Sequence, residues 1–352
     1  MRRLLPLLAA LTPLAAQSFA EGPAFGGTRL FTEGLSTKGN PARFDLAQPG
    51  WYLGWEDGDR QPKDFKALGD RLLSGFTTPD ATQAQGALTD LGKTPYAERR
   101  RAYGLAISAP GGLYFALGQE QLTGLRTYPD LEPARLGAGL AANLTVADVG
   151  HADIQRLVMG AGSGTDGQAY GLALRVERVR LGREQVLLNP ALGGPAEPAG
   201  SALDFKGTES SHLTATVDLG TQFTLAQGIK VALAGDRLIP RTLGGIRENP
   251  QFRAGLTLEL GPTAAVEVES DVNEARRLPL PVDQRSAAAA LRIAFSPSLT
   301  FRVGAERRTV DGQASTLVGA SLRLRNAPLH LTFGFQFGDD RPSRALALKV
   351  DG

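Results

Sequence analysis

The stretch from Leu329 to Gly338 alternates strictly between large apolar residues and polar residues or glycine. Its ten residues read LHLTFGFQFG, with every odd-numbered position apolar. A period of two places successive side chains on opposite faces of a β-strand. The usual strand in a soluble protein has only about five or six residues, whereas a tilted strand needs roughly 9–11 residues to cross a bilayer. This stretch therefore has the length and pattern of a membrane-crossing strand.

The same alternation fills the last hundred residues of the chain. It recurs at 252–260, 263–272, 291–295, 299–306, 322–324 and 346–350. The joints between these stretches are short and contain glycine or proline, as in Gly261-Pro262, which is typical of hairpins. A soluble sandwich would place the apolar faces inside, and a membrane barrel would place them outside. Long strands, short turns and an unbroken series favour an all-β fold, a transmembrane antiparallel up-and-down β-barrel.

Composition limits the classes of function. The mean hydropathy of −0.13 excludes a helical membrane bundle, but it is compatible with a barrel whose lumen and loops are polar. The chain has no cysteine, which excludes disulfides, thiolate metal sites and a cysteine nucleophile. With only three histidines, we expect neither a metal site nor a cofactor.

The first twenty residues have the features of a secretory signal peptide. Arg2 and Arg3 are basic, residues 4–16 are apolar, and Ser18-Phe19-Ala20 fits a cleavage site. Removal of residues 1–20 takes away two arginines and no acid, so 36 basic and 36 acidic residues remain. This balance gives no basic excess for nucleic-acid binding. We expect the protein in the cell outer membrane, with outer-membrane lipid as its partner.

The segment after the signal peptide contains a glycine pair, Gly26 and Gly27, followed by the triplet Asn40, Pro41 and Ala42. Proline fixes φ and asparagine can bond nearby backbone, so the triplet predicts a rigid turn. Together with the strand series, this segment resembles the entry of FadL-like outer-membrane barrels. That superfamily includes the long-chain fatty-acid transporter, conjugal-transfer TraF-type proteins and type IX secretion PorV-type proteins. The resemblance implies that residues 21–48 lie inside the barrel, near its periplasmic end.

Residues 49–352 are then expected to form the barrel, interrupted by a helical insertion at about 60–95. The insertion has apolar residues at helical spacing, and TraF-type relatives also carry an insertion near this position. The earlier strands are expected at 51–56, 102–109, 112–119, 136–146, 167–181, 213–223 and 229–234. Residues 148–160 are ambiguous. The total is about 14 strands, an even number, as single-chain bacterial barrels require.

Charged residues occupy the polar face of five consecutive predicted strands. We expect them to face the lumen: Glu259, Glu267, Glu269, Asp271, Arg292, Arg302, Glu306 and Arg323. Neighbouring strands lie about 4.8 Å apart, so opposite charges can pair across the sheet. The charges form either a structural salt-bridged wall or a polar constriction that selects solutes. The fatty-acid branch of the family would imply an apolar pocket, from which this charged wall departs.

No motif points to an enzyme. Residues 137–142 match a relaxed dinucleotide fingerprint, but no crossover helix or suitably spaced acid follows. The sequence instead predicts an outer-membrane barrel acting as a channel or transporter for small or hydrophobic solutes. The alternative is a structural or accessory barrel of a secretion or conjugal-transfer-type complex, with envelope proteins as partners. A soluble secreted β-protein is a third possibility. The chain ends in LKVDG, without the terminal aromatic residue that such barrels commonly carry.

Overall fold

The computed structural model describes residues 40–43, 49–60, 70–71, 74, 81–93, 96–132, 134–135, 142–165, 167–193, 208–337 and 343–351. The predicted signal peptide, Gly26 and Gly27 lie outside the described residues, as does most of the predicted lumenal segment 21–48.

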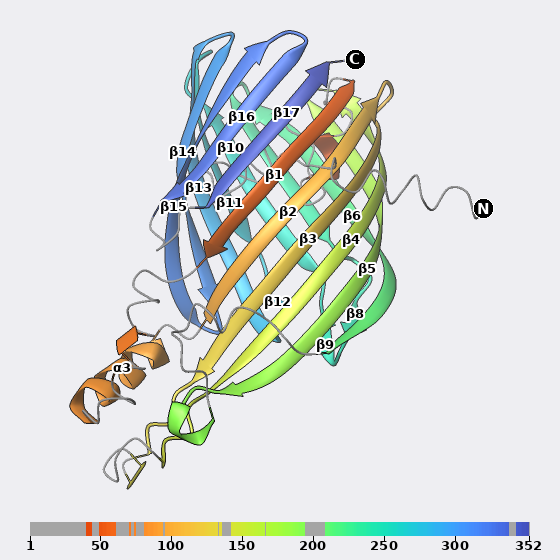
Figure 1. Cartoon of the computed structure of the whole chain (residues 1–352). Helices are drawn as coiled ribbons and strands as arrows, with labels where there is room; N and C mark the ends of the chain where they lie inside the picture. The colour runs from red at the N-terminus through yellow and green to blue at the C-terminus, as the bar shows by residue number, and fades with distance from the viewer. Residues whose placement is uncertain are drawn as a thin grey trace.

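The fold is a closed antiparallel β-barrel of fourteen strands, as the alternation predicts (Figure 1). Its strands are β1 (Gly50–Arg60), β2 (Tyr96–Ala109), β3 (Leu113–Tyr128), β4 (Val146–Thr165), β5 (Gln168–Leu187), β6 (Glu209–Ala226), β7 (Ile229–Asp236), β10 (Gln251–Glu259), β11 (Ala264–Asp271), β13 (Val282–Ser296), β14 (Leu299–Val310), β15 (Gln313–Asn326), β16 (Leu329–Phe337) and β17 (Arg344–Asp351). Each strand pairs with its neighbours in chain order, and pairing of β1 with β17 closes the wall. A short strand, β12 (Ala275–Arg277), pairs with β13.

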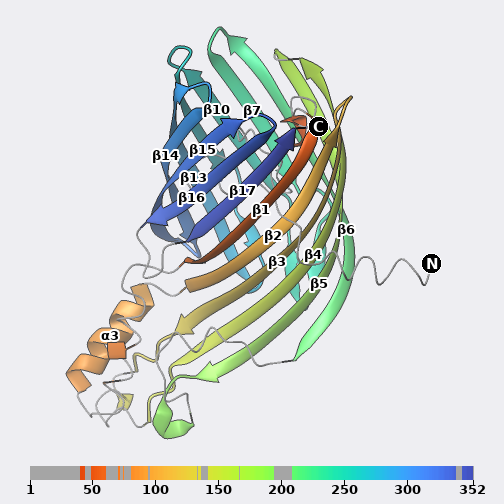
Figure 2. The ribbon, with the colours of Figure 1, turned by 45° about the horizontal axis from the view of Figure 1, so that its top comes forward.

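The two ends of the barrel differ in their connections. At one end, called the short-turn end, the strands join through tight turns such as Gln227-Gly228 and Ala327-Pro328. The C-terminus lies at this end, whereas the helix α3 (Ala81–Lys93) lies beyond the opposite, long-loop end (Figures 1 and 2). Short turns on one side and longer loops on the other are the pattern of outer-membrane barrels. None of the helices in the described part of the chain is both long and apolar enough to span a membrane.

The strand alternation separates an apolar outer face from a polar inner face. On β10 and β16, Leu256, Leu258 and Phe335 are 39%, 41% and 46% exposed. The residues that alternate with these on each strand point inward, and on β16 the inward residues Thr332 and Gln336 are buried. A barrel that shows apolar side chains outward and hides polar ones has the polarity required in lipid.

One predicted strand is wrong. Residues 142–145 are not in a strand, residues 136–141 lie outside the described part, and β4 begins only at Val146. The reason is local side-chain bonding: the Asn143 amide oxygen accepts hydrogen bonds from the backbone N–H and the hydroxyl of Thr145. Such bonds compete with strand pairing. The ambiguous stretch 148–160 lies within β4.

The wall is interrupted beside β6. β7 pairs with β6 only from Leu219 to Ala226, and the chain leaves the wall after Asp236. It then forms a small hairpin of β8 (Arg241–Leu243) and β9 (Ile246–Glu248) before β10 begins. Arg241, Leu243, Ile246 and Glu248 are buried, whereas Thr242 and Arg247 are exposed. One face of the hairpin thus packs into the barrel.

Candidate functional site

A chain of ion pairs crosses the inner face of the first five strands. Acidic and basic residues alternate from one strand to the next, in the order Glu56, Arg100, Glu120, Arg156 and Glu177. The nitrogen–oxygen distances along this series are 3.2, 2.8, 3.2 and 2.5 Å. All five side chains are buried, with Glu177 at 0% exposure. The alternation gives every charge an oppositely charged neighbour, and the charges after Glu56 have one on each side, which stabilises buried charges.

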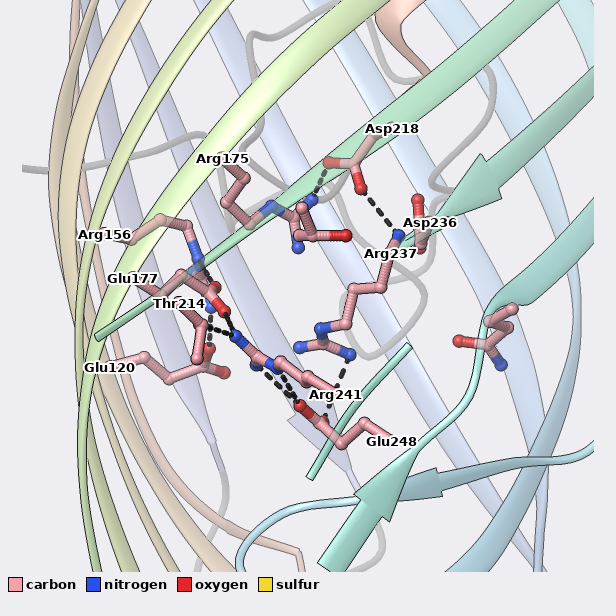
Figure 3. Close-up of polar contacts among 12 residues, drawn as sticks. Glu120, Arg156, Arg175, Glu177, Thr214, Asp218, Asp236, Arg237, Arg241 and Glu248 are labelled. Carbon is pink, nitrogen blue, oxygen red and sulfur yellow. Dashed lines mark hydrogen bonds and ion pairs between the residues drawn. The ribbon is translucent and has the colours of Figure 1, made fainter. Parts of the chain in front are cut away.

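The β8–β9 hairpin continues this network (Figure 3). Arg241 lies 2.5 Å from the second oxygen of Glu177 and 2.6 Å from Glu248, which is directly opposite it on the second strand of the hairpin. Its guanidinium also donates to the Thr214 hydroxyl at 2.6 Å. Arg237 reaches the other oxygen of Glu248 at 3.5 Å. Arg241 therefore links the barrel wall to the hairpin through one buried guanidinium.

Arg237 lies where the chain turns inward, and its backbone has a φ of +54°. Its N–H donates to the Asp218 carboxylate at 2.8 Å, and Asp218 also pairs with Arg175 of β5. The Arg237 guanidinium lies 3.5 Å from the Glu248 carboxylate, so its charge has an acidic partner inside the barrel.

The predicted charged residues lie in the other half of the wall. Arg302 and Arg292 approach the same Glu267 oxygen at 3.7 and 3.6 Å. Asp271 lies 3.0 Å from Arg253, which also contacts Asp236 at 3.1 Å. The remaining members of the predicted set have different surroundings: Glu269, Glu306 and Arg323 are buried, and Glu259 is partly exposed and 3.0 Å from Lys230.

An apolar layer lies next to the charged network. It joins inner-wall residues of β3, β4 and β5 with the apolar side chains of the hairpin. Its members are Leu122, Ala152, Ile154, Val179, Leu181, Leu243, Ile246 and Leu278. These wall positions lie on the long-loop side of the central charges, as Ile154 and Arg156 of β4 show. A further ion pair, Asp148 with Arg183, lies beyond them and nearer the loops. The lumen is thus layered, with an apolar layer between the central charged network and the Asp148–Arg183 pair nearer the long-loop end.

The Asn-Pro-Ala turn packs against the inner wall near the short-turn end. Its residues fall in the 3-10 helix η3 (Pro41–Arg43) and just before it, and both Asn40 and Ala42 are buried. The Asn40 amide donates to the Thr221 carbonyl at 3.2 Å, and its oxygen accepts the Ala42 N–H at 3.0 Å. A Cβ on Gly171 would lie 2.0 Å from the Pro41 carbonyl oxygen. The wall therefore needs glycine where this turn docks.

Sequence reasoning overlooked the charged residues of the first half of the barrel. Arg100 is within a run of like charges, Arg99 to Arg101, and Arg156 is in the ambiguous stretch. A signal did exist, because Arg175 and Glu177 alternate with apolar residues on β5. The hairpin residues Arg241 and Glu248 gave no such signal, since they lie between the predicted strands 229–234 and 252–260. Among the described residues, no group of three or more His, Cys, Asp or Glu could hold a metal ion.

A closed barrel with an apolar exterior, a charged lumen and an inserted N-terminal turn has the architecture of a transmembrane β-barrel. Among solved structures, it is similar to the Pseudomonas putida toluene transporter TodX, with a TM-score of 0.55 and 10% identity over 96% of this chain and 98% of that one. It is also similar to the Ralstonia pickettii toluene transporter TbuX, with a TM-score of 0.53 and 11% identity over 95% and 99%.

These identities are low, so the likeness establishes the fold. The antiparallel β-barrel predicted from the strand alternation is confirmed at that level. No protein-family model matches the sequence, and no curated protein matches it either.

Proposed function

We propose that the chain is an outer-membrane channel that admits small hydrophobic solutes. The observation that carries this proposal is the layered lumen, in which the apolar layer lies on the long-loop side of the central charged network. Apolar side chains with few polar groups favour uncharged ligands. TodX and TbuX, which share the fold, are described as toluene transporters. We expect the protein in the outer membrane and expect no enzymatic activity.

The charged network sets the barrier that such a solute meets. Arg156 and Glu177 are 4% and 0% exposed, so water does not reach them, and an apolar molecule cannot replace the partner of a buried charge. The hairpin is linked to this layer through Arg241 and Glu177. Movement of the hairpin away from β5 would uncover both the apolar layer and the network. The Arg241–Glu177 ion pair therefore holds the hairpin against β5 and keeps the channel closed.

Uptake by proteoliposomes tests the proposal. Vesicles of phosphatidylcholine that contain the purified protein are mixed with toluene or with glucose, and entry is compared with empty vesicles. Faster entry of toluene and no change for glucose is the expected result. The Glu177→Gln variant weakens the Arg241–Glu177 ion pair and should raise toluene entry further. Glu274→Gln, which removes an exposed carboxylate, should not. Equal entry in protein-containing and empty vesicles would refute a channel for hydrophobic solutes.

A second function is favoured by one observation, the burial of the network itself. Ion pairs link the wall from β1 to β5 and then the hairpin, as in a rigid, filled barrel. Such a barrel would serve as a structural or accessory part of an envelope complex, with protein partners at its loops. This function predicts no conductance in planar bilayers. It also predicts that Glu177→Gln lowers stability without opening a path.

A further inference from the structure

Arginines mark one border of the apolar outer face. On five strands, the outward apolar run ends in an exposed arginine at the long-loop end. On β2, for example, Ile107, Leu105 and Tyr103 face outward and are followed on that face by Arg101. We call these side chains the arginine collar. Its members are Arg101 of β2, Arg178 and Arg180 of β5, Arg285 of β13, Arg307 of β14 and Arg344 of β17.

The opposite border has no such charges. Within the last four residues at the short-turn end of each described barrel strand, the outward positions hold no Lys, Arg, Asp or Glu. Trp51, Leu299 and Val350 are examples of the residues found there. The charged residues near this end, such as Lys349, fall on the opposite face of their strands. The collar is thus a property of one side of the barrel only.

Few acids accompany the collar. Asp57 pairs with Arg101 at 3.1 Å, with both side chains about half exposed. Asp153, which lies opposite Arg180 in the sheet register, accepts a hydrogen bond from Gln119 at 2.8 Å. Arg307 and Arg344 have no carboxylate partner among the described residues. The collar therefore presents a net positive charge to whatever surrounds the barrel at this level.

We propose that the arginine collar binds the phosphate groups of membrane lipids on the long-loop side. The proposal rests on the membrane insertion of the barrel. Side chains at the edge of an apolar belt lie at the level of lipid head groups. A guanidinium there can bind a phosphate through two parallel hydrogen bonds. Arg285 and Arg307 face outward on the adjacent strands β13 and β14 and are offset by two residues in the sheet register. These two neighbouring guanidinium groups can share one phosphate.

Lipid binding in detergent micelles tests this assignment. The protein is titrated with dioleoyl phosphatidic acid or with dioleoyl phosphatidylcholine, and the change in Tm and the lipid retained in native mass spectra are measured. Each lost arginine should weaken binding of phosphatidic acid about fivefold. We expect this loss for Arg307→Gln and a larger one for Arg285→Gln with Arg307→Gln. The control Arg247→Gln removes an exposed arginine of the hairpin and should change nothing.

Three results would overturn the proposal. One is equal binding of the two lipids by the unmodified protein, and another is unchanged phosphatidic acid binding by the double variant. A third is the same stabilisation by inorganic phosphate, which would assign the site to a free anion and not to a lipid. Insertion into phosphatidylcholine vesicles, followed by protease protection, is scored separately. A failure of the barrel to insert can therefore be told apart from a failure of the collar to bind phosphate.

Discussion

The Arg308 guanidinium of β14 lies 2.8 Å from the Glu98 carboxylate of β2, although four strands separate β2 from β14 along the wall. The pair therefore crosses the lumen. The Tyr96 hydroxyl donates to Glu98 at 3.0 Å, and Arg308 donates to the Gln284 side chain at 2.7 Å. At this level, charged side chains therefore bridge the lumen from one part of the wall to another as well as lining it.

Breaking this bridge should destabilise the barrel. Arg308→Ala leaves Glu98 buried without its cross-lumen partner, which costs about 3–5 kcal/mol of unfolding free energy for a buried pair. Thermal or urea unfolding in detergent measures the loss. Arg307→Ala is the matched control, because Arg307 is one residue away but exposed, so its effect should stay within about 0.5 kcal/mol. Equal losses for the two variants would show that the bridge does not contribute to stability.

The architecture could be predicted because its signal is repeated. A period of two over many strands, as in Leu329 to Gly338, is enforced by the membrane on one face and by the lumen on the other. Each strand therefore carries its own sequence pattern that predicts a barrel. The charged residues predicted on β10 to β15 depend on the same signal, since Arg302 and Glu267 alternate with apolar neighbours.

The pairing of charges could not be predicted. Glu98 and Arg308 are more than two hundred residues apart in the chain, and no local period links them. The hairpin residues Arg241 and Glu248 enter the network only because β7 ends early and the chain turns inward after Asp236. Such contacts depend on how far each strand extends and on the diameter of the barrel, which a single sequence does not fix.

The docking of the Asn-Pro-Ala turn yields a second prediction. In Gly171→Ala, the new methyl group would collide with the Pro41 carbonyl, and overpacking of this kind costs about 1–3 kcal/mol. The turn should move off the wall, and trypsin should then cleave after Arg43 faster in the folded protein. Gly167→Ala serves as control, because its nearest neighbour would be a Thr165 hydroxyl at 3.7 Å. Unchanged cleavage in Gly171→Ala would mean that the turn is held elsewhere.

A third prediction concerns the outer face. Phe333 lies between Leu322 and Leu346 in the sheet register, so we expect it to face lipid, as we do Leu331, Phe301 and Val303. Phe333→Arg should lower stability in vesicles by about 2–4 kcal/mol near the bilayer midplane. Arginine at Asn326, an exposed end of β15, should cost far less. A hydrophilic thiol reagent should label a cysteine at Phe333 poorly in membranes, and ready labelling would contradict the assignment.

The loop between β3 and β4 gives a prediction for pH. The Asp130 carboxylate accepts the Leu144 N–H at 2.9 Å and the Glu132 N–H at 3.2 Å. The Leu144 bond in particular holds the pKa of Asp130 below its usual value, and Arg135 adds to this.

A carboxyl group whose pKa is lower in the folded state stabilises the fold above its unfolded pKa, and this stability is lost as pH falls through the folded pKa. Asp130→Asn should therefore flatten the dependence of Tm on pH between about pH 5 and about pH 2. Glu274→Gln, at an exposed site, is the control. If Asp130→Asn kept the full acid slope, the carboxylate would contribute nothing to it.

The last prediction separates a structural wall from a constriction. Arg302 is 2% exposed and shares the Glu267 carboxylate with Arg292. In a structural wall, Arg302→Ala leaves Glu267 with a weaker set of partners and should lower the unfolding free energy by about 3–5 kcal/mol. Any conductance in planar bilayers should keep its preference between cations and anions. In a constriction, the same change would remove a fixed positive charge from the path and shift selectivity toward cations.

Burial favours the structural outcome, because a side chain that water does not reach cannot contact passing ions. Tm in detergent and reversal potentials under a salt gradient are therefore measured on the same preparations. Arg307→Ala, on the outer face of the same strand, controls for the loss of one positive charge. A clear selectivity shift at unchanged Tm would show that Arg302 lines an open path and that the wall functions as a filter.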